Sequence, residues 1–80
     1  MAQVRLFAAA RDAAGTGRVE LPGATVGEVL DRARERYGES FAALLPTCKI
    51  WVNGEPAAPP DSIATTDELA VLPPVSGGSS

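Results

Sequence analysis

The sequence contains no histidine and only one cysteine, Cys48. These absences exclude an internal disulfide, a Cys/His zinc site, a four-cysteine iron–sulfur cluster and acid–base catalysis by histidine. Cys48 precedes an apolar run typical of a strand, where a lone cysteine usually behaves as a small buried hydrophobe, so no role is assigned to it. No metal site is expected, and much ordinary enzyme chemistry is excluded.

Basic residues are also few. The chain has seven lysines and arginines and ten acidic residues, which give a net charge of −3. Such a chain has no dense basic surface to neutralise phosphates, so nucleic acid is not expected as a partner. A long apolar run is absent from the first residues, MAQVRLF, so neither a signal peptide nor a membrane helix is expected there. These features predict a cytoplasmic protein.

Eighty residues, of which 45% are hydrophobic, suffice for one small core and leave no room for a second module. All strand and helix patterns fall within residues 1–74, whereas residues 75–80 contain only valine, serine and glycine. We therefore expect one folded domain over residues 1–74 and a flexible C-terminal tail over residues 75–80, which carries Gly77 and Gly78.

The first quarter of the chain predicts two strands joined by a wide loop. Residues 3–9 alternate between the two faces of a strand, and residues 18–21 alternate again after a stop at Gly15 and Gly17. In the first strand the core face carries Val4, Leu6 and Ala8, and the opposite face carries Arg5 and Phe7. The alanine-rich residues 8–14 between the strands are compatible with a helical turn.

A helix over residues 26–37 is the clearest predicted element. Thr25 and Glu28 match a capping box at its start, and Gly38 suits a left-handed stop at its end. The apolar stripe of this helix consists of Val26, Val29, Leu30, Ala33 and Tyr37. One stripe at helical spacing packs on a sheet, and the charged residues on the other side are interpreted as a solvated face.

The second half of the chain predicts three more strands after a connecting stretch over residues 39–48. Residues 49–53 alternate, with Ile50 and Val52 opposite Lys49 and Trp51. Asn53-Gly54 favours a tight hairpin turn that returns a short strand over residues 55–58. Residues 68–72 form the last strand, with Leu69 and Val71 towards the core.

This order of elements predicts an α+β protein with a β-grasp (ubiquitin-like) fold. We expect a mixed sheet of four to five strands with one main helix packed on one face. A β-grasp ferredoxin is excluded, because its cluster needs four thiolates and the chain has one cysteine.

The C-terminal tail has two features that suit chemistry at a chain end. Pro73 and Pro74 cannot continue a strand ladder and favour an extended arm. Gly77 and Gly78 add two residues without side chains, as a chain needs if its carboxyl end must enter a narrow channel of another protein. Composition alone favours a different interpretation, because Ser-Gly-Gly-Ser-Ser is also typical of a flexible linker.

Four stretches of the sequence carry a resemblance to a known family. They are residues 4–11 (VRLFAAAR), 25–30 (TVGEVL), 52–55 (VNGE) and 67–78 (DELAVLPPVSGG). Together they resemble the small, sulfur-carrying subunit of molybdopterin synthase, within the MoaD/ThiS-like group. The first three stretches are weakly specific singly, whereas a Pro-Pro-Val-Ser-Gly-Gly end after a final strand is highly specific.

The resemblance implies that Gly78 is the working residue. A ubiquitin-activating-like adenylyltransferase joins its carboxylate to AMP from ATP, and a sulfur donor then displaces AMP to leave a thiocarboxylate. In molybdenum cofactor biosynthesis the large subunit of molybdopterin synthase supplies the active-site groups, and the sulfur enters molybdopterin. The chain would bind no cofactor and act as a cosubstrate of this sulfurtransferase, with Pro74, Val75, Ser76 and Gly77 threading the carboxylate into the partner.

A docking surface is expected on the outward face of the sheet. Strand alternation places Phe7, Trp51 and Leu72 on outward positions of strands that a β-grasp brings near one another. Exposed aromatic residues there would mark an interface. The alternative is that the protein's own loops cover these three side chains.

The sequence departs from the family at its end, because Ser79 and Ser80 follow Gly78. Adenylation needs a free glycine carboxylate, so either a processing protease removes the two serines or the serines are foreign to the chain. The sulfur recipient also stays open, since related carriers serve thiamine, cysteine or tRNA thiolation. A protein modifier that forms isopeptide bonds and an interaction domain with an inert tail are further alternatives.

Overall fold

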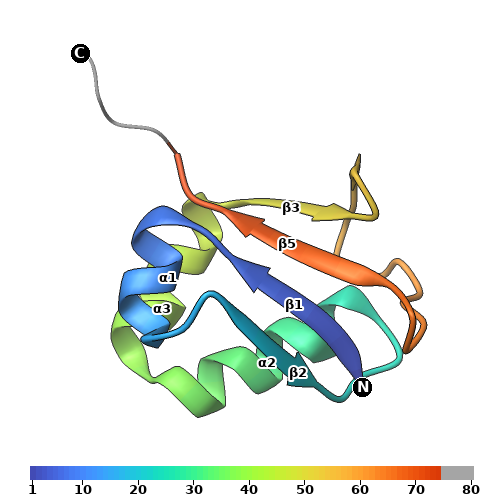
Figure 1. The fold of residues 1–80 in the computed structure, drawn as a ribbon, viewed down its shortest axis with the longest axis horizontal. Coiled ribbons are helices and arrows are strands. Elements are labelled where there is room, and N and C mark those ends of the chain that lie inside the picture. Colours follow the sequence, from blue (N-terminus) through green and yellow to red (C-terminus); the bar gives the residue numbers. More distant parts are fainter. Residues whose placement is uncertain (75–80) are drawn as a thin grey trace.

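The computed structural model describes residues 1–74 of the chain. The predictions for Val75, Ser76, Gly77 and Gly78 fall outside these residues. The strands are β1 (Ala2–Leu6), β2 (Arg18–Leu21), β3 (Lys49–Val52), β4 (Glu55–Pro56) and β5 (Glu68–Leu72). The helices are α1 (Ala8–Ala14), α2 (Val26–Tyr37) and α3 (Glu39–Leu44), and a 3-10 turn, η1 (Leu45–Thr47), follows α3 (Figure 1).

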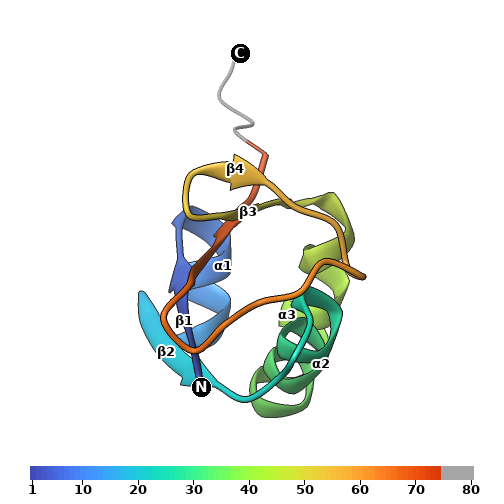
Figure 2. The same cartoon turned by 90° about the vertical axis from the view of Figure 1, so that its right-hand side faces the viewer.

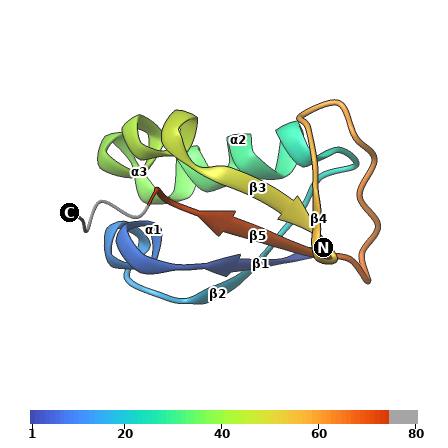
Figure 3. The ribbon, with the colours of Figure 1, turned by 90° about the horizontal axis from the view of Figure 1, so that it is seen from above.

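The five strands form one mixed sheet in the order β2-β1-β5-β3-β4. β1 and β5 pair in parallel at its centre, and all other neighbours pair antiparallel. In the view of Figure 2, α2 and α3 lie together on one side of the sheet, and Figure 3 shows the same arrangement from above. A parallel central pair made by the first and last strands, with the main helix between them in sequence, is the predicted β-grasp fold.

The sequence at the start of α2 explains why the helix begins there. The side-chain oxygen of Thr25 accepts a hydrogen bond from the Glu28 amide at 3.2 Å. The Glu28 carboxylate accepts one from the amide of Ala24 at 2.8 Å. The predicted capping box is therefore present, with the reciprocal bond made one residue earlier than in the usual form.

A distant loop completes the start of α2. The amides of Val26 and Gly27 donate to the carbonyl oxygens of Asp61 and Pro59 at 2.9 and 2.8 Å. A side chain at position 27 would place its Cβ 3.2 Å from the Pro59 oxygen, so the close approach of this loop favours glycine. The first turn of α2 and the segment before β5 are thereby held together.

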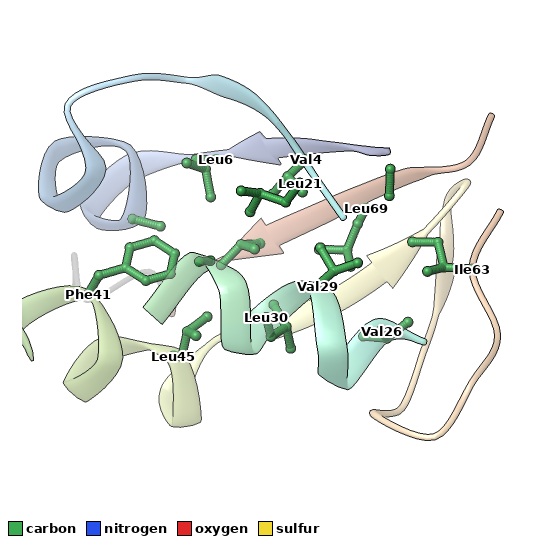
Figure 4. Packing of buried hydrophobic residues seen from close by; sticks show 14 residues of the cluster. Val4, Leu6, Leu21, Val26, Val29, Leu30, Phe41, Leu45, Ile63 and Leu69 are labelled. Atoms are coloured by element: carbon green, nitrogen blue, oxygen red, sulfur yellow. The ribbon is translucent and has the colours of Figure 1, made fainter. Parts of the chain in front are cut away.

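The hydrophobic core lies between the inner face of the sheet and the helices (Figure 4). Alternate side chains of β1 and β5 form the sheet side of this core, and the predicted apolar stripe of α2 packs against them from the helix side. Phe41 of α3 is the largest fully buried side chain. The core consists of Ala2, Val4, Leu6, Ala10, Leu21, Val26, Val29, Leu30, Ala33, Phe41, Leu45, Ile63, Leu69 and Val71. Burial of Leu69 and Val71 confirms the predicted faces of the last strand.

The end of the first strand differs from the prediction. Residue Ala8 was expected on the core face, but β1 ends at Leu6 and Ala8 is exposed. Ala8 has a positive φ of 49°, which turns the chain out of the sheet and begins α1 directly after the extended Phe7. Ala10 occupies the buried position instead, so the predicted helical turn is a helix with one residue in the core.

The stretch over residues 39–48 is also more regular than predicted. It contains α3 and η1, which contribute the buried Phe41 and Leu45. Gly38 has a φ of 88° with an extended ψ of −165°, a region open mainly to glycine, and the chain there breaks from α2 into α3. The prediction of one main helix is confirmed, because α2 is the longest helix, but the helical state of this connecting stretch was not predicted.

The hairpin after β3 has the predicted tight turn but a shorter returning strand than predicted. Asn53 and Gly54 have φ values of 51° and 83°, which confirms the turn that the Asn-Gly pair predicts. The returning strand β4 covers only Glu55–Pro56 rather than residues 55–58.

No helix within residues 1–74 has the length and apolar character needed to cross a bilayer.

Candidate functional site

The chain leaves the sheet from the end of its central strand. β5 ends at Leu72, Pro73 is buried and Pro74 is exposed. Pro73 and Pro74 lack amide donors, so the β5 ladder cannot continue through them. We call these two residues the tail root. A groove of about 410 Å³ lies beside it, lined by Thr47, Lys49, Leu72, Pro73 and Pro74. The predicted reactive residue, Gly78, lies four residues beyond Pro74 and outside the described residues.

The three residues predicted to dock a partner share the outward face of the sheet. Phe7 lies beside the end of β5, since its amide donates to the Val71 carbonyl at 3.3 Å. Phe7 is 37% exposed, and Leu72 and Trp51 are partly exposed, so the protein's own loops do not cover them fully. The predicted placement is correct, and the docking role stays a prediction. We call Phe7, Trp51 and Leu72 the outer patch.

The register of the strands shows what surrounds the outer patch. Leu72 pairs with Lys49, and Trp51 pairs with Ala70 on one side and with Pro56 on the other. Trp51, which is partly exposed, is thus flanked by one small and one rigid residue. Strand alternation predicts Ala70 on this face together with Leu72, and the structure places it there. Pro56 was not assigned to this face from the sequence, although the hairpin register could have placed it.

Arg5 fixes the charged edge of the outer patch. Its guanidinium carbon lies 5.5 Å from the centroid of the Phe7 ring, which is a cation–π distance. One guanidinium nitrogen also lies 3.4 Å from the Glu68 carboxylate. Both partners are more than a third exposed, so this ion pair adds little stability. Its effect is to hold Arg5 beside Phe7 on the outward face.

A polar cluster at the other end of β5 sets the register that brings the tail root and Lys49 together. The Asn53 side chain accepts from the Glu68 amide at 3.0 Å and donates to the Asp67 carboxylate at 2.9 Å. The same carboxylate accepts from the Ala64 amide at 2.8 Å. Hydrogen bonds from Ala64 and then Asn53 lower the pKa of Asp67 below its ordinary value, so the carboxylate keeps its charge at more acidic pH than an ordinary aspartate does. The cluster ties β3 to β5.

Cys48 is a free, partly buried cysteine whose surroundings disfavour the reactive thiolate. It is partly buried against the core, and its sulfur lies 3.4 Å from the Leu44 carbonyl oxygen. Burial raises the pKa of its thiol, which favours the unreactive protonated form. Within residues 1–74 no three histidine, cysteine, aspartate or glutamate side chains gather as metal ligands would. The features described above are therefore the outer patch, the tail root and the groove beside the tail root.

A β-grasp sheet whose central strand leads through two prolines towards a Gly-Gly sequence defines a small ubiquitin-like protein of the MoaD/ThiS-like type. The ThiS family model matches residues 4–78, which include Gly77 and Gly78. The chain therefore belongs to the ThiS family, whose members serve as sulfur carriers and ubiquitin-like modifiers.

Three proteins illustrate the similarity. Small archaeal modifier protein 1 of Haloferax volcanii is 39% identical over 84 residues, covering 92% of this chain and 97% of that protein. Its crystal structure superposes with a TM-score of 0.76 at 36% identity, over 95% of this chain and 97% of that chain. A chain of the Amycolatopsis orientalis BexX/CysO complex is 27% identical and superposes with a TM-score of 0.82, over 98% of this chain and 100% of that chain. A Pyrococcus furiosus protein assigned as subunit 1 of molybdopterin converting factor is 28% identical and superposes with a TM-score of 0.78, over 92% of this chain and 97% of that chain.

Proposed function

We propose that this chain carries an activated C-terminal carboxylate, which it passes on as a sulfur carrier or as a protein modifier. The observation that carries the proposal is the family match through Gly78, on a fold whose central strand delivers the tail root at the surface beside an outer patch. The similarity to an archaeal modifier protein over nearly the whole chain supports the function as a protein modifier. Both functions, sulfur carrier and protein modifier, need the same first step, which is activation of Gly78.

The chemistry of that step follows from the carboxylate itself. A protease first removes Ser79 and Ser80, so that the Gly78 carboxylate is free. The carboxylate attacks the α-phosphorus of ATP in the activating partner, and pyrophosphate leaves. A sulfur nucleophile can then displace AMP to leave a thiocarboxylate, or a lysine amine can displace AMP to leave an isopeptide bond. A charged carboxylate is a poor electrophile, so neither product forms without the adenylate.

The protein itself contributes position rather than catalysis. ATP belongs to the activating partner, a ubiquitin-activating-like adenylyltransferase, and this chain is a cosubstrate without a bound cofactor. The outer patch docks on the partner, and the tail root aims residues 75–78 at its active site. Because the step consumes ATP, we place it in the cytoplasm.

Molybdopterin synthesis is the recipient pathway that we favour among the sulfur-transfer alternatives. The Pro-Pro-Val-Ser-Gly-Gly ending and the similarity to the Pyrococcus furiosus protein support it. In this pathway the large subunit of molybdopterin synthase would receive the thiocarboxylate. Similarity to a chain of the BexX/CysO complex supports carriers that serve other recipients, so co-purification of the large subunit is the observation that separates them.

Disruption of the outer patch tests the proposed docking. We expect Leu72→Glu to weaken binding to the activating partner by about 30-fold, because a buried interface charge removes roughly 2 kcal/mol at a central contact. The matched control is Ala43→Glu, which adds the same charge at an exposed position of α3. The measurement is the concentration of carrier that gives half of the maximal rate of ATP–pyrophosphate exchange.

The same assay can contradict the docking proposal. Thermal unfolding of both variants must first show that the fold is intact. Equal half-maximal concentrations for Leu72→Glu and Ala43→Glu would mean that the partner does not contact this part of the sheet. Phe7→Ala gives a second, uncharged probe of the same surface, with a smaller expected effect in the same direction.

A further inference from the structure

Lys49 is the only lysine of the chain, whereas the other six basic residues are arginines. A guanidinium group keeps its proton at any physiological pH and does not act as an acyl acceptor. A lysine amine does, once it has lost its proton. Of the seven basic side chains, only Lys49 can therefore form an isopeptide bond.

Lys49 is accessible and stands beside the tail root. It is exposed at the first position of β3, and within residues 1–74 its ammonium group makes no ion pair or side-chain hydrogen bond. It pairs with Leu72 across the sheet and lines the groove with Pro73 and Pro74. Figure 1 shows the start of β3 next to the end of β5.

The α-amine of Met1 is the other amine of the chain, and it lies elsewhere. β1 runs parallel to β5, so its first residue is at the opposite end of the sheet from the tail root. Figure 1 places the N-terminus at that far end. The fold therefore separates the two possible acceptors, and each would attach an added group to a different part of the surface.

We propose that Lys49 is a modification site at which a second copy of this chain is attached through its Gly78. The inference rests on the proposed function, because it uses the Gly78 adenylate. The Lys49 amine, after losing one proton, attacks the Gly78 carbonyl carbon of the second copy. The new carbon–nitrogen bond forms as the bond to the AMP oxygen breaks, AMP leaves, and the nitrogen releases a second proton to solvent.

The attachment has a consequence for the modified copy. Lys49 shares the outward face of β3 with Trp51 and lies opposite Leu72, so a whole domain attached to its amine covers two residues of the outer patch. The modified copy then cannot dock on the activating partner, and its own Gly78 is no longer adenylated. Modification at Lys49 therefore removes a free copy from the pool of carriers.

The test uses the chain ending at Gly78, the activating partner purified from the same organism, and ATP. Digestion after glutamate leaves a distinctive branched peptide, in which residues 40–55 are joined through Lys49 to residues 69–78. We expect mass spectrometry to find this peptide in the wild-type reaction. Lys49→Arg keeps the charge and should reduce the self-linked product at least tenfold.

Hydroxylamine trapping separates the two proposals. A hydroxamate at Gly78 reports adenylation without any acceptor lysine, and we expect it from wild type and Lys49→Arg alike. Hydroxamate without a self-linked product would overturn the Lys49 site and leave the proposed function standing. A linkage at the Met1 amine, or one that persists in Lys49→Arg, would also overturn it. No hydroxamate at all would overturn the proposed function, and the Lys49 site with it.

The purified Lys49-linked dimer tests the blocking effect. Its one free Gly78 belongs to the modified copy, so pyrophosphate exchange reports on that copy alone. We expect a rate at least tenfold below that of the monomer. A rate equal to that of the monomer would contradict covering of the outer patch.

Discussion

A chain that ends at Gly77 should lose adenylate formation by at least about 100-fold relative to a chain that ends at Gly78. Removing one residue withdraws the carboxylate by roughly 3.5 Å, and a misplacement of about 1 Å already costs that much when reacting groups must be aligned. The full chain ending at Ser80 should be equally unreactive, because its carboxylate lies two residues too far along. ATP–pyrophosphate exchange with the purified activating partner measures all three chains.

The three chain ends share one control. The core and the outer patch lie within residues 2–72, so the thermal unfolding midpoints of the three proteins should agree. A chain ending at Ser80 that is adenylated as fast as one ending at Gly78 would contradict the requirement for a glycine carboxylate. Equal rates for Gly77 and Gly78 ends would show that the partner does not measure the length of the tail.

Phe41→Ala should destabilise the fold by about 3–5 kcal/mol, the usual cost of removing a fully buried aromatic ring. Phe41 is 0% exposed and its ring lies 5.3 Å from that of Tyr37, centroid to centroid. A domain of this size has only about 5–15 kcal/mol of stability in total, so the variant should be close to unfolding. The urea midpoint at constant m-value measures the loss.

Phe7→Ala is the matched control for that experiment. It removes the same ring from a position that is 37% exposed and outside the core. The expected loss is about 1 kcal/mol or less, made up of partial burial and the cation–π contact with Arg5. Similar losses for the two variants would mean that α3 does not pack in the core as described.

The contrast between α2 and α3 shows what local sequence can and cannot predict. α2 has a capping box, a stripe over three turns and a glycine at its end, and these signals agree. α3 has only six residues, too few for a period to stand out, and isolated helices of that length are not stable. Its helical state depends on burying Phe41 against other elements, which is a tertiary effect.

The candidate site was predictable to a similar extent. Strand alternation places Phe7, Trp51 and Leu72 outward, and this needs no knowledge of the sheet. The neighbours of these residues depend on strand order, because Lys49 meets Leu72 only when β3 pairs with β5. Pairing between the first and last strands is likewise non-local. The position of Lys49 beside Leu72 therefore follows from the strand order and could not be predicted from its place in the sequence.

The central claim concerns the chemical state of the chain end in the cell, and intact-mass spectrometry of untagged protein from its own source tests it most directly. We expect a species that ends at Gly78, with one carboxylate oxygen replaced by sulfur when the pathway is active. Species of higher mass, in which Gly78 is joined to another protein, would instead indicate the function as a protein modifier. A chain that always ends at Ser80, unmodified, under conditions where the pathway is active would contradict the claim.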